Sequence, residues 1–233
     1  MTGWPNQYPT ISRPVENARL RTVSFGAGVQ STTMLLMAAE GLIGPRPDVA
    51  IFADTGDEPQ EVYDHLKKVQ AMHLPFPIEI VTAAASRTKA DGIREQVLGW
   101  TRGEIAHAHG RPPLFVSTEG QRVSMTRRQC TEEWKIVPIE RRMRELLGLK
   151  KGQHGPKTPV VEQWIGISMD EVYRLKPART RWIYKRHPLI EADMDRRACV
   201  AFCETRGITP PKSACRICPF HDDAEWHRLQ SLA

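Results

Sequence analysis

The chain of 233 residues contains no apolar run that approaches the length of a membrane span. Residues 1–18 also lack the apolar stretch of a signal peptide, and we expect them to form a loose arm. These absences exclude a membrane-spanning protein and predict a cytoplasmic one. The chain ends soon after its last pair of cysteines, which fits a truncated or partly ordered form of a longer protein.

Cysteine is scarce, and its number is odd. The five cysteines are Cys130, Cys199, Cys203, Cys215 and Cys218. An odd number in a chain without a secretory signal argues against a framework of disulfides. Metal binding or redox chemistry is therefore the better interpretation.

The remaining composition is that of an ordinary globular protein. Hydrophobic residues make up 40% and charged residues 26% of the chain, whose length suits one domain with at most a small appendage. The net charge of +6 fits a polyanionic partner such as tRNA or DNA, and it equally fits a protein that only binds nucleotides.

Short apolar runs alternate with segments of helical periodicity. This alternation predicts an α/β fold, a doubly wound and mostly parallel sheet with helices on both faces, followed by a C-terminal cysteine-rich knuckle. Residues 83–128 have weak periodicity, and we expect an extended insertion there. The expected strands are Val23–Phe25, Val49–Ala53, Ile78–Val81 and Trp164–Ile167; helices are expected over Val29–Glu40, through Val62, Leu66, Val69 and His73, and through Ile136, Ile139, Met143 and Leu146.

The segment Arg21–Gly41 carries the strongest local signal, a strand, a glycine-containing turn and a helix that begins on hydroxyl residues. Gly26 and Gly28 allow a tight bend and the close approach of an anion, and the helix N-terminus with Ser31 and Thr32 favours a phosphate. The turn lacks the Gly-Lys-Ser/Thr of P-loop NTPases and the third glycine of the dinucleotide fingerprint. An ordinary strand-to-helix turn is the competing interpretation.

Two further segments have the same form. Asp54-Thr55-Gly56 follows the second strand, where the acidic group can hold Mg²⁺ or a ribose hydroxyl, or only cap the next helix. Gly166 ends a later strand, and Arg174 follows it as a candidate for phosphate binding or as the partner of Glu171 in a surface ion pair. Because carboxyl ends of parallel strands meet at one edge, we expect the Gly26 turn and the Asp54 turn to share one crevice.

Taken in this order, the motifs resemble the PP-loop ATP pyrophosphatase superfamily, specifically its phosphoadenosine phosphosulfate reductase-like branch. That branch has a Ser-Gly-Gly-x-Asp-Ser turn, an Asp-Thr-Gly turn, a Gly-x-x-x-x-Glu-Ser-x-Arg-like segment, an apolar Pro-Leu-Ile stretch and a cysteine knuckle. His187-Pro188-Leu189-Ile190 fills the fourth position here. The sequence departs from the pattern at Gln30, where the family often has Asp, and at Val172, where a hydroxyl is lost.

The resemblance implies that ATP binds at the first turn with Mg²⁺, and that a substrate oxygen attacks the α-phosphorus and releases pyrophosphate. Asp54, Lys135 and Arg174 are the implied catalytic residues. The implied domains are an arm (1–20), a nucleotide-binding α/β domain (21–187) and a C-terminal helical segment with cysteines (188–233). The implied nucleotide-binding residues are Ser24, Phe25, Gly26, Ala27, Gly28, Gln30, Ser31, Thr32, Phe52, Ala53, Asp54, Thr55, Gly56 and Gly166.

The cysteines add a metal hypothesis. Cys215-Arg-Ile-Cys218-Pro has the spacing of a metal knuckle, and one such pair needs two further ligands. The resemblance implies that Cys130 and Cys199 complete a four-cysteine site, which leaves Cys203 spare. The ligand set suits a [4Fe–4S] cluster or Zn²⁺, and only the resemblance favours iron.

Three functions remain open from the sequence. The first is ATP-dependent activation coupled to sulfur transfer onto tRNA or DNA, with a sulfur-donor protein as a partner. The second is reduction of phosphoadenosine or adenosine phosphosulfate, although the chain has neither the tandem cysteines nor the C-terminal Glu-Cys-Gly-x-His segment of those enzymes. The third is a non-catalytic nucleotide- or nucleic-acid-binding module with structural zinc.

Overall fold

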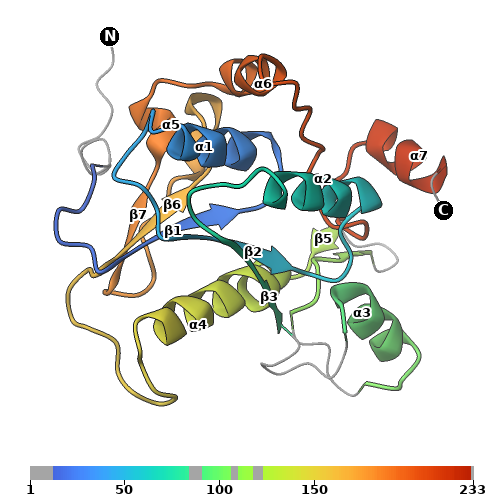
Figure 1. The fold of residues 1–233 in the computed structure, drawn as a ribbon. Helices are drawn as coiled ribbons and strands as arrows, with labels where there is room; N and C mark the ends of the chain where they lie inside the picture. Colours follow the sequence, from blue (N-terminus) through green and yellow to red (C-terminus); the bar gives the residue numbers. More distant parts are fainter. Residues whose placement is uncertain (1–12, 84–90, 106–109, 118–122, 232–233) are drawn as a thin grey trace, which may run out of the picture. The chain divides into compact units, whose positions relative to one another are not determined.

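The structure, a computed structural model, describes residues 13–83, 91–105, 110–117 and 123–231. Five strands form a parallel sheet in the order β3-β2-β1-β6-β7 (Figure 1). The strands are β1 (Leu20–Phe25), β2 (Val49–Asp54), β3 (Ile78–Thr82), β6 (Val161–Ile165) and β7 (Ile183–Arg186). A parallel sheet with crossing helices was predicted from the alternation of apolar runs, and the fold class is confirmed.

Helices lie on both faces of the sheet. Thr22 Oγ1 lies 3.4 Å from the sulfur of Met143, which places the end of α4 (Val137–Leu146) against one face. The helix α1 (Val29–Ala39) covers the other face (Figure 1). On its far side, α1 packs against α6 (Arg196–Glu204), where Thr33 Oγ1 donates to the carbonyl of Cys199 at 3.0 Å. This position between two layers explains why almost every residue of α1 is buried.

The remaining elements are short. They are the helices α2 (Gln60–Gln70), α3 (Ile93–Thr101), α5 (Pro188–Glu191) and α7 (Asp223–Ser231), a π-helical turn (Thr131–Ile136), a 3₁₀ helix (Met169–Arg174) and the antiparallel pair β4 (Phe115–Val116) and β5 (Ser124–Met125). No helix in the described ranges is both long and apolar enough to cross a membrane.

Some predicted boundaries were wrong. His73 lies beyond the end of α2 and has φ 50°, so it belongs to the turn after that helix. Ile136 ends a π-helical turn instead of opening an α-helix, and the strand predicted over Trp164–Ile167 is shifted to Val161–Ile165. The predicted insertion contains the helix α3 and the small β4–β5 pair, while residues 84–90, 106–109 and 118–122 of it lie outside the described residues.

The chain divides into two compact units built from alternating segments. Unit 1 comprises Met1–Phe52, His65–Glu79 and Met143–Lys212, and unit 2 comprises Ala53–Asp64, Ile80–Arg142 and Ser213–Ala233. The β1–α1 turn and the helix α6 belong to unit 1. The Asp54 turn, Lys135 and the Cys215 knuckle belong to unit 2. The predicted division at residues 20 and 187 remains a prediction.

Candidate functional site

The turn between β1 and α1 gathers backbone donors at one point. The N–H groups of Gly26 and Gly28 each donate to the hydroxyl oxygen of Ser31 at 3.2 Å, and that hydroxyl donates to the carbonyl of Gly28 at 3.1 Å. Ser31 stands in the first turn of α1, so the partial positive charge of the helix N-terminus acts at the same place. Two convergent N–H groups at a helix N-terminus are the elements of an anion site.

The bend itself is made differently from the sequence expectation. Ala27, with φ 56°, is the left-handed residue of the turn, and Gly28 is extended. Alanine in this conformation costs roughly 1–2 kcal/mol. Ala27 is completely buried, so surrounding structure holds it in place. Because Gly28 is extended, this position does not need the backbone freedom of glycine. What glycine contributes here is the absence of a side chain, which would leave room for a ligand.

Gly166 brings the end of β6 against this turn. A Cβ on Gly166 would lie 3.1 Å from the backbone nitrogen of Ser31 and 3.2 Å from its Cα. Because the strand order places β6 beside β1, on the side away from β2, the gap between β1 and β6 is the topological switch point of the sheet. We call the β1–α1 turn, residues 26–31, together with residues 166–168 the carboxyl edge.

An arginine that the sequence reasoning missed also reaches the carboxyl edge. Arg196 Nη1 donates to Gln30 Oε1 at 3.2 Å, and Gln30 Nε2 lies 3.5 Å from Ser168 Oγ. The backbone N–H of Arg196 donates to Asp170 at 2.8 Å. Hydrogen bonds from the Ser168 side chain and from this backbone group hold the pKa of Asp170 below its usual range. Nothing in the local sequence around residue 196 signals this proximity.

The other hydroxyls predicted to bind a nucleotide are committed to neighbouring side chains. Thr32 Oγ1 lies 2.9 Å from His65 Nε2 in the interior, and Ser24 Oγ accepts a bond from Gln163 at 2.9 Å. Burial lowers the pKa of His65, and nearby Lys68 adds to the effect. Within unit 1, Ser31 is therefore the hydroxyl of the three that the structure places at the turn.

The predicted apolar contacts lie in the core, and the predicted cation is paired. Phe25 and Phe52 are 2% exposed, with ring centroids 6.4 Å apart. Arg174 forms an ion pair with Glu171 at 2.7 Å and is half exposed. This is the surface pair that the sequence offered as the alternative for Arg174.

In unit 2, Asp54 shapes the turn that follows β2. Its Oδ1 accepts hydrogen bonds from the N–H of Gly56 and the hydroxyl of Tyr63, both at 2.8 Å. Burial and the Asp54 carboxylate raise the pKa of Tyr63. Gly56 has φ 69°, and a Cβ there would lie 2.8 Å from the backbone of both Asp91 and Gly92. These contacts explain the form of the turn in structural terms, and the role of Asp54 in binding a nucleotide remains a prediction.

A second constellation in unit 2, which we call the Glu58 cluster, consists of Thr55, Glu58, Lys135 and Cys215. Glu58 is almost fully buried, and its Oε1 accepts from Thr55 at 3.2 Å, Lys135 at 3.3 Å and the Cys215 thiol at 3.5 Å. Its Oε2 has no hydrogen-bond partner among the described residues. The cluster joins three segments of unit 2 around one carboxylate.

Charge and burial act in opposite directions within the Glu58 cluster. Burial works to lower the pKa of Lys135, but the charge of Glu58 and the nearby Cys215 and Cys130 outweigh it, and the pKa is raised. Burial, followed by the charge of Glu58, raises the pKa of Cys215 to about 12. At neutral pH Lys135 is therefore an ammonium and Cys215 a protonated thiol.

The four cysteines of the predicted metal site are divided between the units. Cys199 lies in unit 1, fully buried, while Cys130, Cys215 and Cys218 lie in unit 2. Burial raises the pKa of Cys199 to about 11, whereas metal ligation requires a thiolate. Over the described ranges, no group of three or more His, Cys, Asp or Glu side chains is arranged to hold a metal ion. The four-cysteine site remains a prediction.

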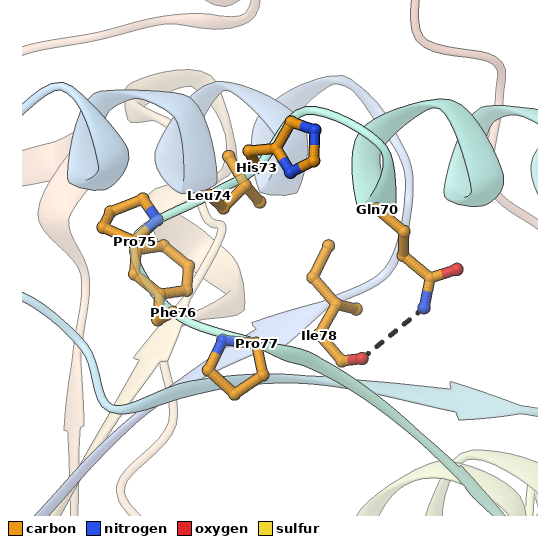
Figure 2. A pocket seen from close by; sticks show the side chains of 7 residues that line it. All are labelled: Gln70, His73, Leu74, Pro75, Phe76, Pro77 and Ile78. Atoms are coloured by element: carbon orange, nitrogen blue, oxygen red, sulfur yellow. Dashed lines mark hydrogen bonds between the residues drawn. The ribbon is translucent and has the colours of Figure 1, made fainter.

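Two cavities lie within the units. One of about 470 Å³ is lined by the segment that joins α2 to β3 in unit 1 (Figure 2), where Gln70 donates to the carbonyl of Ile78 at 3.5 Å. Since it opens at the amino end of β3, it is not at the ligand-binding edge of a parallel sheet. The other, about 330 Å³, is in unit 2 and is lined by Gly56, Asp57, Glu58, Gln60, Tyr63, Asp91, Gly92, Arg94, Glu95 and Arg216.

Comparison with known proteins places the fold. No family profile matches the chain, and no curated protein matches its sequence. Among solved structures, it is similar to a phosphoadenylyl-sulfate (PAPS) reductase from Candida auris in a phosphate complex, with a TM-score of 0.50 and 16% identity. The match covers 82% of this chain and 74% of the reductase chain. The chain therefore has the PAPS reductase-like fold that the order of its motifs predicted.

Proposed function

We propose that this chain is an enzyme that binds an adenine nucleotide and holds its phosphates at the carboxyl edge. The observation that carries the proposal is the convergence of the Gly26 and Gly28 N–H groups on one oxygen, 3.2 Å from each. That oxygen is the neutral hydroxyl of Ser31, and it stands for a phosphate oxygen. When Ser31 turns to another rotamer, its hydroxyl becomes a donor to the phosphate that replaces it.

The location agrees with this function. The turn lies at the switch point of the sheet and at the N-terminus of an 11-residue helix, where the backbone favours an anion. Gly166 keeps the opposite wall free of a side chain. These features bind phosphate through backbone groups, so they do not depend on the carboxylate that Gln30 replaces.

Two reactions are candidates for the bound nucleotide. Reduction of phosphoadenylyl sulfate is supported by the shared fold with the Candida auris reductase. ATP-dependent, pyrophosphate-releasing sulfur transfer onto tRNA or DNA is supported by the net charge of +6, which fits a polyanionic acceptor. We rank the reductase first because its support is the fold of most of the chain.

The partners predicted from the sequence belong to this proposal. Mg²⁺ would accompany ATP, and a sulfur-donor protein would serve the transfer reaction. A [4Fe–4S] cluster or Zn²⁺ on the cysteines has support from the CxxC spacing, and from the position of Cys130 and Cys215 beside Lys135. Elemental analysis of the anaerobically purified chain decides whether iron or zinc is bound.

Calorimetric titration with ATP, phosphoadenylyl sulfate and adenosine tests the proposal. We expect both phosphorylated nucleotides to bind more tightly than adenosine. Gly28→Val should weaken the binding of both nucleotides by at least roughly tenfold, because a branched side chain covers the N–H groups. Gly28→Ala, the matched small substitution, should weaken their binding less. Sulfite release with a thiol reductant, against pyrophosphate release with Mg-ATP and tRNA or DNA, then separates the reactions. If none of the three compounds binds, the proposal is overturned.

A further inference from the structure

We propose that Arg196 is the side-chain cation that binds the nucleotide phosphates at the carboxyl edge, and that Gln30 holds it in place without pairing its charge. This inference rests on the proposed function. The sequence pointed to Arg174 and Lys135 instead, but the structure gives both of them carboxylate partners, Glu171 at 2.7 Å and Glu58 at 3.3 Å.

The backbone of Arg196 is fixed. Its N–H donates to Asp170 Oδ1 at 2.8 Å, and the preceding Asp195 caps α6 by accepting from Ala198 N at 2.7 Å. The side chain is exposed, so its guanidinium reaches the surface of unit 1 from a rigid helix start. The hydrogen bond from Arg196 Nη1 to Gln30 restrains this exposed side chain, which lowers the entropy that it loses when it binds a ligand.

The guanidinium lies one glutamine side chain away from the convergent N–H groups. Gln30 precedes Ser31, and its backbone packs against Gly166, whose added Cβ would stand 3.3 Å from the Gln30 carbonyl carbon. The 3.2 Å bond from Arg196 Nη1 to Gln30 Oε1 therefore ties α6 to the turn that holds Ser31. A phosphate held at this turn would have the guanidinium within reach of its other oxygens.

The guanidinium of Arg196 has no close carboxylate partner among the described residues, unlike those of two other arginines of unit 1. Arg186 pairs with Glu191 at 2.7 Å and Glu162 at 3.1 Å, and Arg206 pairs with Glu40. In contrast, Arg196 bonds to a neutral amide, and its guanidinium has no carboxylate within 4.0 Å among the residues that the structure describes. Asp170 lies close enough for the two charges to interact, but it bonds to the backbone N–H of Arg196. The five donors of the guanidinium therefore remain largely available to an anion.

This arrangement gives Gln30 a role as a positioning residue. An amide oxygen orients the guanidinium without cancelling its charge. A carboxylate at residue 30 would form an ion pair with Arg196 and compete with the phosphate.

Binding measurements on the full chain test the inference. Arg196→Gln should weaken the binding of ATP and of inorganic pyrophosphate by roughly tenfold or more, because a charged hydrogen bond to phosphate is lost. Adenosine binding should stay unchanged. Arg197→Gln, which removes the exposed neighbouring charge, is the matched control and should leave all affinities near those of the unaltered chain. Arg196→Lys should restore part of the loss.

Gln30→Glu supplies an independent test. It should weaken ATP binding about as strongly as Arg196→Gln does. The dependence of ATP affinity on salt concentration should fall in both variants, because one fewer cation contacts the phosphates. Thermal unfolding shows that each variant is folded. Equal ATP affinity for Arg196→Gln and the unaltered chain overturns this inference alone, whereas failure of the unaltered chain to bind ATP, pyrophosphate or phosphoadenylyl sulfate overturns the proposed function.

Discussion

The carboxyl edge of unit 1 and the Glu58 cluster of unit 2 are built from different chemical groups. At the carboxyl edge, the groups at the centre are backbone N–H groups of Gly26 and Gly28, with a glycine from the neighbouring strand against them. In the Glu58 cluster, every partner of the central carboxylate is a side chain: a hydroxyl, an ammonium and a thiol. The edge depends on how closely backbones approach, and the cluster depends on charge balance in a buried place.

This difference predicts how each region responds to substitution. A backbone site tolerates the loss of neighbouring side chains but not the addition of atoms between its walls. A buried charged site tolerates added atoms where a side chain can move, but not the loss of one charge.

The largest effect should come from Lys135→Met in the Glu58 cluster. The Glu58 side chain is 1% exposed, and Lys135 is the cation paired with it at 3.3 Å. Removal of the ammonium leaves a buried carboxylate, and we expect the free energy of unfolding in urea to fall by about 3 kcal/mol. Glu58 keeps hydrogen bonds from Thr55 and Cys215, which do not replace a positive charge.

Two further variants distinguish charge balance from packing. Glu58→Gln combined with Lys135→Met should recover much of the loss, because the double variant buries a neutral amide. Lys150→Met, on the exposed surface, should change unfolding by no more than about 0.5 kcal/mol. A loss of less than about 1 kcal/mol for Lys135→Met would show that water reaches Glu58 and that the cluster is not the buried charged site described above.

The same contrast explains what the sequence predicted. Four of the five strands of the sheet, the β1–α1 turn and Gly166 after β6 were predicted because apolar runs and glycine positions are local signals, whereas β7 was missed. Arg196 was missed because it meets Gln30 across 166 residues of sequence, through the packing of α6 on α1. Similarly, Cys215 meets Glu58 across 157 residues. Side-chain partnerships of this range depend on tertiary packing, so no spacing rule reveals them.

Some local signals also had two meanings that only the fold separates. Asp54 was both a candidate ligand and a candidate cap, and its contacts with Gly56 and Tyr63 show that it organises its own turn. Thr32 stands beside Ser31 in the sequence, yet it faces His65 in the interior. One residue of difference on a helix is a rotation of about 100°, which separates a hydroxyl at the edge from a buried one.

Acid should lower the free energy of unfolding through His187, which follows β7. Burial, with Lys185 nearby, lowers the pKa of His187 to about 4. The unfolded chain protonates this histidine below about pH 6.5, whereas the folded chain resists protonation until about pH 4, so stability is lost as the pH falls through this interval. The loss should reach at most about 3 kcal/mol near pH 4.

Urea unfolding at pH 7, 5.5 and 4 measures this dependence, and His187→Gln is the control that removes the titrating group. The variant should have a shallower fall with acid, and subtraction isolates His187 from His65, whose pKa is lowered by burial in the same direction. Parallel curves for the variant and the unaltered chain would show that His187 titrates normally in the folded state.

The smallest expected effect is the most direct test of the contrast, because it uses one substitution at two glycines. In Gly166→Ala the new methyl meets backbone atoms of Ser31 at 3.1 and 3.2 Å. In Gly99→Ala, inside α3, it meets the terminal carbon of the Ile105 side chain at 2.8 Å. That shorter contact is the easier one to relieve, since a terminal carbon moves by a rotamer change and a helix start does not.

We therefore expect Gly166→Ala to lose about 1 kcal/mol, and to weaken ATP binding several-fold by moving the turn. Gly99→Ala should be neutral or gain up to about 1 kcal/mol from helix propensity. Thermal unfolding and calorimetric titration of both variants measure this difference, and a Gly166→Ala variant that is as stable as the unaltered chain and binds ATP equally well would mean that the backbone wall of the carboxyl edge moves as freely as a side chain.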